Sequence, residues 1–208
     1  MSPRAYKMEH REAVTDKTRD RILAAARKLL LAEDFSQFTM ESVARAADVS
    51  RLTIYYQFKS KAGLLEAVYD YLARRGQMYK LAEVFRHYDP IHMLHEFIAT
   101  FARFWSSERE VIRRLHGMGA IDSDIGEGLR ARNERRRNGL RVIVERYCEI
   151  YPPLIPAQEP VAIDMLHMLT SFETFDALAG SARDREEVAE IIRPLAYRAI
   201  GFIPKQIS

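Results

Sequence analysis

Two neighbouring tyrosines, Tyr55 and Tyr56, stand among several cations in the stretch SRLTIYYQFKSK, residues 50–61. Adjacent residues of a helix point roughly 100° apart, so a single buried face cannot take both rings. A phenol offers an apolar ring for the wall of a nucleic-acid groove and a hydroxyl for a phosphate oxygen. The outward ring therefore indicates contact with a polyanion, and the alternative is an aromatic half buried at the rim of a core.

The positive charge of the chain gathers near its N-terminus. The formal net charge over 208 residues is only +3, but residues 1–62 hold 12 Lys and Arg against 8 Asp and Glu. The remaining residues hold 20 against 21. The basic excess therefore coincides with the tyrosine pair, which favours a polyanionic partner for this part of the chain.

The bulk composition excludes several classes of protein. An apolar content of 48% allows a substantial core. The single cysteine, Cys148, excludes a disulfide framework within one chain, and the polar N-terminal segment lacks the apolar run of a signal peptide. No stretch is long and apolar enough to suggest a membrane segment. We expect a soluble, cytoplasmic protein.

Apolar residues recur at helical spacing along most of the chain, and sustained alternation typical of strands is missing, so we expect an all-α fold. Thr39 and Ser50 are candidate N-caps, and Gly76 is a candidate bend. The expected helices cover 18–33, about 40–47, 51–58, 61 into the eighties, a segment opening at Asp89–Pro90, 108–117, 123–150, 161–178 and 185–199, with a proline-rich connector at 151–160.

The helices at 40–47 and 51–58, with the short connection between them, predict a helix-turn-helix. The second helix then needs two faces. Ile54 and Phe58 are four residues apart and form the inward face. The residues left to point towards DNA are Arg51, Thr53, Tyr55, Tyr56 and Gln57.

Residues 19–68 resemble the DNA-binding domain of the TetR family of bacterial transcriptional regulators. The most specific signature of that family stands here as Thr53, Ile54, Tyr55, Phe58, Ser60 and Lys61. The resemblance implies an N-terminal three-helix helix-turn-helix domain at 1–62, ordered from about residue 18. A long helix would join it to a helical effector-binding and dimerisation domain at 63–208.

Two positions depart from the family pattern. Asp48 stands in the turn where the family usually has glycine, and aspartate tolerates the left-handed conformation better than most residues. Leu52 stands where the family usually has a small residue. At the exposed start of the recognition helix it could contact a thymine methyl group and alter the preferred bases.

The resemblance also implies roles for single residues. Arg51 is the candidate for reading a guanine edge, and Lys61 can meet a phosphate at the start of its helix. The N-terminal arm, with Arg4, Lys7, Arg11 and Lys17, either adds DNA contacts or is a solvated tail. The full DNA-binding set is Thr39, Ser50, Arg51, Leu52, Thr53, Tyr55, Tyr56, Gln57 and Lys61.

A single helix-turn-helix reads too few base pairs to be selective, so we expect a homodimer on two half-sites of double-stranded operator DNA. The segment 161–178 carries apolar residues on several faces, more than one core can absorb. An ordinary core helix is the alternative. The expected interface residues are Met165, Leu169, Phe172, Phe175, Ile191 and Leu195.

By resemblance, the middle helices enclose a pocket for an unknown small-molecule effector, largely apolar or aromatic, that releases a repressor from its operator. Activation is also open, and each pocket residue alone could be plain core. The expected lining is Phe97, Phe101, Phe104, Trp105, His116, Met118, Tyr147 and Met168.

The competing hypothesis is a helical metal-dependent enzyme whose helix-turn-helix is only structural. His92, His95 and Glu96 stand at i, i+3 and i+4 of one helix, a cluster that could bind a metal. They lack a third-ligand motif and the spacing of a zincin, and the chain has no phosphate-binding glycine loop or nucleophile motif. We therefore expect no catalytic residue, no metal and no cofactor.

Overall fold

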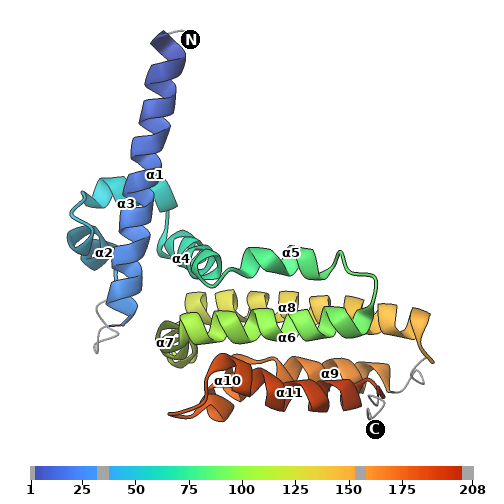
Figure 1. Ribbon diagram of the computed structural model, residues 1–208. Helices are drawn as coiled ribbons and strands as arrows, with labels where there is room; N and C mark the ends of the chain where they lie inside the picture. The colour runs from blue at the N-terminus through green and yellow to red at the C-terminus, as the bar shows by residue number, and fades with distance from the viewer. Residues whose placement is uncertain (1–2, 32–37, 153–157, 203–208) are drawn as a thin grey trace. The chain divides into compact units, whose positions relative to one another are not determined.

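The computed structural model describes residues 3–31, 38–152 and 158–202, with side chains from residue 16 on. Every regular element in these ranges is a helix, as Figure 1 shows, which confirms the all-α prediction. The elements are α1 (Pro3–Leu30), α2 (Met40–Ala46), α3 (Arg51–Phe58), α4 (Lys61–Arg75), the 3-10 turn η2 (Met78–Lys80), α5 (Leu81–Val84), α6 (Pro90–Ser107), α7 (Arg109–Gly119), α8 (Ser123–Ile150), α9 (Glu159–Leu169), α10 (Phe172–Ala179) and α11 (Arg185–Ala199).

The helices pack into two compact units. The first comprises residues 1–72 and 113–128, and the second 73–112 and 129–208. Helices α4, α7 and α8 each continue from one unit into the other. These units differ from the ranges 1–62 and 63–208 expected from the sequence, which remain a prediction for independently folding domains.

The first unit is built on a small core in which α1 packs against α2 and α2 against α3. Helix α2 contributes Met40 and two small side chains, Val43 and Ala44, and the small ones let the neighbouring helices approach closely. Ile54 and Phe58 are both buried, so the inward face predicted for α3 is confirmed. The other buried residues include Ile22, Leu23, Ala26 and Leu30 from α1, and Leu64, Leu65 and Val68 from α4.

The second unit surrounds α6, which packs against α5, α10 and α11, while α9 packs against α11 (Figure 1). Aromatic side chains follow one another along α6: the ring centroids of Phe97 and Phe101 are 4.7 Å apart, and those of Phe101 and Trp105 are 5.6 Å apart. Phe172 of α10 meets Trp105 edge-on at 5.7 Å. These rings join the aliphatic residues of α8, α9 and α11 in one core.

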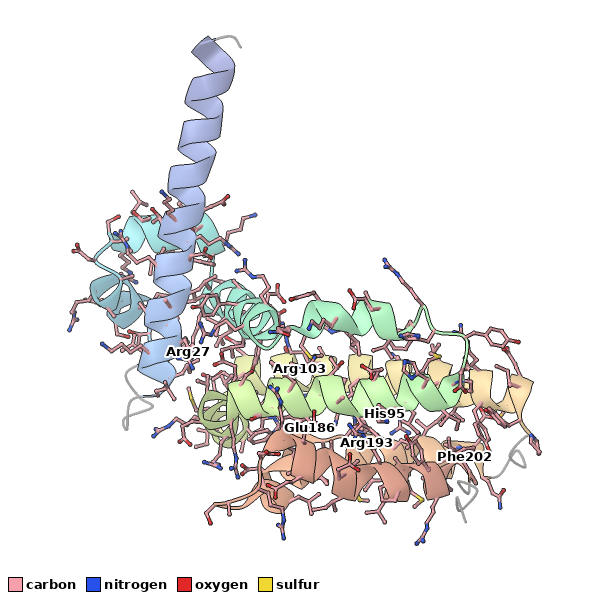
Figure 2. All side chains as sticks on the ribbon, viewed as in Figure 1. Arg27, His95, Arg103, Glu186, Arg193 and Phe202 are labelled. Carbon is pink, nitrogen blue, oxygen red and sulfur yellow. The ribbon has the colours of Figure 1, made fainter. Side chains whose placement is uncertain are left out.

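Polar side chains also lie between α6 and α11. Figure 2 places His95 of α6 near Arg193 of α11. Arg193 is almost buried and pairs with Glu186 and Glu190 on its own helix. These ion pairs satisfy a charge that would otherwise be costly beside the core. None of the helices in the described ranges combines the length and apolar content that a membrane crossing needs.

Three helix boundaries differ from the sequence prediction. Helix α1 begins at Pro3 rather than near residue 18. The helix expected from 61 into the eighties ends at Arg75, because Gln77 takes a left-handed φ of 59°. A Cβ on Gly76 would lie only 2.4 Å from Cδ2 of Phe104, so the close approach of this ring requires glycine.

The helix expected over 161–178 is also divided in two. Thr170 and Ser171 interrupt it between α9 and α10. Ser171 has an extended backbone and accepts a 3.1 Å hydrogen bond from the backbone N–H of Thr174, which makes it the N-cap of α10. Trp105 Nε1 donates to the carbonyl oxygen of Thr170 over 3.0 Å. The interruption of the helix therefore leaves a backbone carbonyl that accepts the hydrogen bond of the buried Trp105 indole.

Candidate nucleic-acid interface

Helices α2 and α3 meet at a tight turn held by backbone hydrogen bonds. Val49 N donates to the carbonyl oxygen of Ala44 over 3.0 Å, and Asp48 has a φ of 51°. Aspartate therefore takes the left-handed conformation that favours glycine, which confirms the expectation for this departure from the family pattern. The carbonyl oxygen of Asp48 lies 3.5 Å from a guanidinium nitrogen of Arg21 on α1.

Both helices of this pair begin with a side-chain cap. Thr39 forms a reciprocal capping box with Ser42, over 3.1 and 2.9 Å. Ser50 accepts from the backbone N–H of Thr53 over 3.0 Å, and the two hydroxyls are 2.8 Å apart. The caps predicted at Thr39 and Ser50 are confirmed. The hydroxyls of Ser50 and Thr53 already serve the cap, which limits their freedom to contact phosphate.

The outward face of α3 is apolar as well as basic. Leu52 is 78% exposed and Tyr56 is 84% exposed, whereas Tyr55 is 39% exposed. Exposed apolar side chains of this size do not contribute burial free energy to the fold, so a contiguous group of them indicates a surface that binds a partner. Of the tyrosine pair, Tyr56 is therefore the fully outward ring, and Tyr55 lies along the rim.

Arg51 and Tyr55 form a pair on this surface. The Cζ of Arg51 lies 5.5 Å from the centroid of the Tyr55 ring. A hydrogen bond with Tyr55, followed by the charge interaction with that phenol, raises the pKa of Arg51. The ring thus orients an exposed guanidinium that would otherwise sample many rotamers.

Gln57 and Lys61 are less available than the sequence suggested. The amide oxygen of Gln57 is buried and has no hydrogen-bond partner among the described residues. The Nζ of Lys61 pairs with Oδ2 of Asp122, and both side chains are half-buried. Asp122 also accepts from the backbone N–H of Asp124 over 3.1 Å. The hydrogen bond from Lys61 is the main cause that lowers the pKa of Asp122.

One segment of the chain matches a known protein family. The model of the bacterial regulatory proteins of the TetR family matches residues 22–68, which run from α1 through the helix-turn-helix into α4. Residues 22–68 thus match the DNA-binding segment of TetR-family regulators. The family resemblance that the sequence suggested is therefore confirmed, on the segment that builds the outward face of α3.

Two curated relatives match part of this chain. The transcriptional regulator AlkX of Mycobacterium tuberculosis is 45% identical over 60 residues, which are 29% of this chain and 28% of AlkX. The regulator YvkB of Bacillus subtilis, itself uncharacterized, is 35% identical over 77 residues, or 36% of this chain and 41% of YvkB. The chain thus spans less than half the length of each, and both names describe regulators rather than enzymes.

Solved structures extend the likeness to the rest of the fold. NalD of Pseudomonas aeruginosa, the secondary repressor of the MexAB-OprM multidrug efflux pump, superposes with a TM-score of 0.69. The match covers 92% of this chain and 98% of NalD at 20% identity. At this identity the likeness establishes the fold of the second unit but not its ligand.

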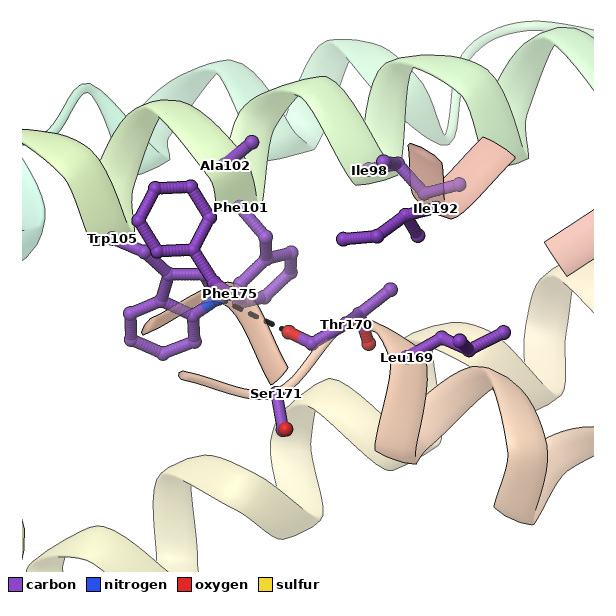
Figure 3. Close-up of a pocket in the computed structure, with 9 residues that line it drawn as sticks. All are labelled: Ile98, Phe101, Ala102, Trp105, Leu169, Thr170, Ser171, Phe175 and Ile192. Carbon is purple, nitrogen blue, oxygen red and sulfur yellow. Dashed lines mark hydrogen bonds between the residues drawn. The ribbon is translucent and has the colours of Figure 1, made fainter. Parts of the chain in front are cut away.

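The second unit contains a small cavity at the break between α9 and α10 (Figure 3). Its volume is about 10 Å³, room for a single water molecule. Of the expected effector residues, Phe101 and Trp105 line this cavity. Phe97 and Tyr147 are buried in the surrounding core, and Phe104 packs against it. The complete lining is Ile98, Phe101, Ala102, Trp105, Leu169, Thr170, Ser171, Phe175 and Ile192.

Three expected effector residues lie away from this cavity. Met168 is 58% exposed and points out of the core, because it lies on the outer side of α9. His116 and Met118 belong to the first unit. Helical spacing could not separate these residues from the lining, since it indicates an apolar face without showing which element covers it.

The residues expected at the dimer interface divide into two groups. Leu169, Phe172 and Phe175 are buried in the core of the second unit, so they are not free to meet another chain. Met165 and Leu195 are 42% and 44% exposed, and Ile191 is half-buried. Phe172 and Phe175 follow the break between α9 and α10 and face inward, whereas Leu169 is buried at the end of α9. Helical spacing predicted one continuous helix over 161–178 and did not indicate the break.

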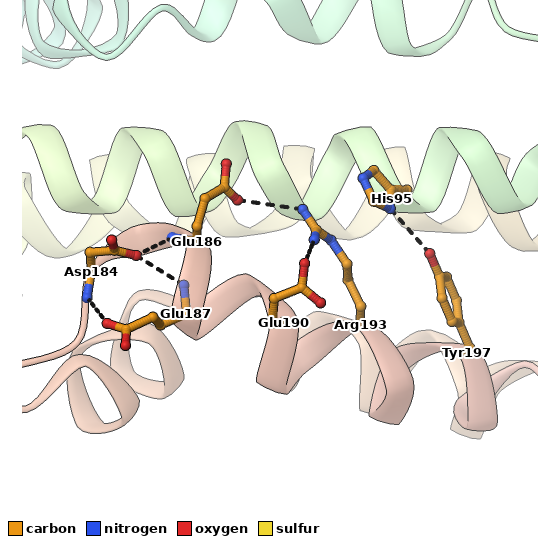
Figure 4. Close-up of polar contacts among 7 residues, drawn as sticks. All are labelled: His95, Asp184, Glu186, Glu187, Glu190, Arg193 and Tyr197. Atoms are coloured by element: carbon orange, nitrogen blue, oxygen red, sulfur yellow. Dashed lines mark hydrogen bonds and ion pairs between the residues drawn. The ribbon is translucent and has the colours of Figure 1, made fainter.

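The metal cluster of the competing hypothesis is not assembled. Nδ1 of His95 lies 3.3 Å from the hydroxyl of Tyr197, as Figure 4 shows. Burial, followed by the charge of Arg193, lowers the pKa of His95. His92 is exposed. Within the part of the chain that the structure describes, no group of three or more His, Cys, Asp and Glu side chains could hold a metal ion.

Two polar residues with long-range contacts, Asp122 and Arg136, could not be singled out from the sequence. Asp122 reaches Lys61 from a distant part of the sequence, and Arg136 is buried in the second unit at 4% exposure. Arg136 belongs to the basic run RARNERRRNGLR, in which nothing in the sequence distinguishes it from its exposed neighbours. The side chains of Arg4, Lys7 and Arg11 lie outside the described residues, and Lys17 is exposed.

Proposed function

We propose that this chain is a dimeric, sequence-specific DNA-binding regulator of transcription, a repressor that a small apolar or aromatic effector releases from its operator. The outward face of α3 carries the proposal. Arg51, Leu52 and Tyr56 are held in water at the start and middle of a capped recognition helix. A guanidinium can bond to both acceptors of a guanine edge, and a leucine can contact a thymine methyl group. Such a regulator would act in the cytoplasm.

The exposed apolar stripe on α9 and α11 supports dimerisation. Val161, Met165 and Met168 follow one face of α9, and they are 55%, 42% and 58% exposed. Leu195 adds a 44% exposed side chain on α11, which packs beside α9. The same stripe on a second copy would give a self-complementary interface of four helices, and TetR-family regulators form dimers.

Release by an effector would use the helices shared by the two units. Helices α4, α7 and α8 run without a break from the second unit into the first. A ligand that changed their arrangement would alter the spacing of the two recognition helices of a dimer, which must match half-sites roughly 34–36 Å apart. To empty the operator, the ligand must bind the DNA-incompetent state more tightly, by several kcal/mol.

Selection from random double-stranded DNA tests the proposal. The full chain should enrich a pseudo-palindromic sequence with two half-sites separated by one helical turn or a multiple of it. A variant with Arg51→Ala and Tyr56→Ala, both on exposed positions, should fold normally and enrich nothing. Failure of the wild-type chain to enrich any sequence would overturn the proposal, because non-specific binding by cations alone cannot select bases.

A further inference from the structure

A positive charge is buried in the second unit without an acid at contact distance. Arg136 on α8 is 4% exposed, and no ion pair joins it to an acid among the described residues. Burial lowers the pKa of Arg136 to about 10, and the charge of the exposed Glu173 opposes this shift at longer range. The guanidinium therefore stays charged at neutral pH, in a place where a charge is costly.

The polar contacts of Arg136 are all to neutral groups. Its Nη2 donates to Oδ1 of Asn133 over 3.2 Å and lies 2.9 Å from Nε2 of His167. Its Nη1 lies 3.5 Å from the hydroxyl oxygen of Thr170. The Nε–H is buried and has no partner in the part of the chain that the structure describes. Three of the five N–H groups of the guanidinium thus have weak or neutral acceptors, and a buried donor is left unused.

His167 cannot satisfy all its neighbours in the absence of a further acceptor. Its Nε2 lies 2.9 Å from Nη2 of Arg136 and 3.2 Å from the carbonyl oxygen of Asn133. Arginine only donates, so Nε2 must carry a lone pair to accept from it. The same nitrogen then has no proton to give to the carbonyl oxygen. An anionic oxygen that accepted from Arg136 in place of Nε2 would free this nitrogen to carry a proton and donate it to the carbonyl oxygen.

This cluster lies against the aromatic cavity of the second unit. Thr170, whose hydroxyl meets Arg136, lines the cavity. So does Phe101, whose ring centroid lies 5.9 Å from the Cζ of Arg136. Figure 3 shows Phe101 on α6 and Thr170 at the α9–α10 break, with Trp105 hydrogen-bonded to Thr170. An apolar cavity with a buried cation directly behind two of its lining residues is suited to an amphipathic anion.

We propose that Arg136, beside His167 and Thr170, donates hydrogen bonds to the carboxylate of an organic acid whose apolar body enters the cavity between α6 and the α9–α10 break. The inference rests on the proposed function, because it assigns this acid as the effector. One carboxylate oxygen accepts a hydrogen bond from the free Nε–H of Arg136. The other accepts from an Nη–H that now faces a neutral side chain. The cavity has room for only one water molecule, so the ligand must separate α6 from the break as it enters.

Calorimetric titration of the full chain tests the site without DNA. The probes are the straight-chain monocarboxylates from hexanoate to dodecanoate and the phenylalkanoates, each compared with its own primary amide. We expect at least one carboxylate to bind below about 1 mM, and at least about tenfold more tightly than its amide. Equal binding of every acid and amide, or no binding by any acid, overturns the proposal.

Matched variants test whether the preference for acid over amide depends on the buried charge of Arg136. Arg136→Gln keeps donors for Asn133 and Thr170 but removes the charge, and Arg136→Met removes both. Each should abolish the preference for acid over amide, whereas Arg135→Met, at an exposed position on the same helix, should retain it. Circular dichroism melts establish which variants fold, and the glutamine variant keeps the test valid if the methionine variant does not. A retained preference in a folded Arg136 variant overturns the proposal.

The same probes separate this inference from the proposed function. The tightest acid is added to the chain bound to its selected operator, and fluorescence anisotropy reports release. Release in the wild type but not in Arg136→Gln supports both. If the acid binds through Arg136 but does not release DNA, the anion site is supported and the assignment of the acid as the effector is overturned. Release by the amides alone, with no effect of Arg136→Gln, keeps the regulator and overturns the anion site.

Discussion

Lys61, the first residue of α4, donates a hydrogen bond from Nζ to Oδ2 of Asp122, the residue that precedes α8. The first turn of α4 follows the recognition helix directly, and its cation was expected to meet a DNA phosphate. In the free chain the ammonium group of Lys61 is already paired with the carboxylate of Asp122. A phosphate contact by Lys61 therefore requires it to leave Asp122, which weakens DNA binding by the free energy of the pair.

We predict that Asp122→Asn raises DNA affinity on all sequences, by up to about fivefold, because the pair is half-exposed. Asparagine keeps an oxygen to accept from the backbone of α8. In this background Lys61→Ala should make the slope of log affinity against log salt shallower by about one. Anisotropy titrations at several salt concentrations measure both effects, with Asp124→Asn as the control. Unchanged affinity in Asp122→Asn would show that the pair does not compete with DNA.

Gly76 ends α4 under the ring of Phe104, and this position should not accept a side chain. A Cβ there would lie 2.4 Å from Cδ2 and 3.2 Å from Cα of Phe104. We expect Gly76→Ala to lower the free energy of unfolding by about 1–3 kcal/mol. Gly117 on α7 has nothing within 4 Å of such a Cβ, so Gly117→Ala should be neutral or stabilising by up to about 1 kcal/mol. Urea unfolding of both variants compares them, and equal effects would contradict the crowding at Gly76.

The exposed stripe on α9 and α11 should hold two copies of the chain together. We predict that Met165→Glu combined with Leu195→Glu gives a folded monomer at micromolar concentration, because the interface would bury unpaired charges. Tyr88→Glu, at an 80% exposed position away from the stripe, should leave the dimer intact. Sedimentation velocity distinguishes the species. A wild-type monomer at the same concentration would rule out this interface.

His167 should make the stability of the second unit depend on pH. Burial, followed by the charge of Arg136, lowers its pKa, and Arg137 acts in the same direction while Glu134 and the carbonyl of Asn133 oppose it. In the unfolded chain the imidazole takes up its proton near pH 6.5, and in the folded chain only at lower pH. The unfolded state thus binds more protons below about pH 6.5, so stability falls as the pH drops.

Thermal melts between about pH 7.5 and pH 5.5 test this prediction. The wild-type melting temperature should fall with pH, and His167→Gln should fall less, because glutamine does not titrate. Curves of the same slope would mean that His167 takes up its proton at an ordinary pH in the folded chain.

The local parts of this structure could be predicted from the sequence, whereas its long-range polar contacts could not. Helix α3 has the predicted bounds because Ser50 caps it and Ile54 and Phe58 bury one face, which are all short-range signals. The pairing of Lys61 with Asp122 joins residues 61 positions apart, and no spacing rule indicates it. Phe172 and Phe175 were predicted to face a second chain, but Thr170 and Ser171 interrupt the helix and turn both rings into the core.

The central claim is that α3 reads bases through its outward face, and paired substitutions at Arg51 and Tyr55 test it most directly. Both residues are exposed, so neither change should lower the melting temperature much. Arg51→Ala should cost about 1–3 kcal/mol on the selected operator and much less on a site with the contacted base pair changed.

Tyr55→Phe keeps the ring beside Arg51 and removes only the hydroxyl. We expect it to weaken binding by a similar factor on every sequence, because a phosphate contact carries no base information. The deciding measurement is an anisotropy titration of both variants on the selected operator and on its changed site. Relaxed specificity in Arg51→Ala with retained specificity in Tyr55→Phe is the predicted result. Undiminished, equally specific binding by both variants would contradict the account.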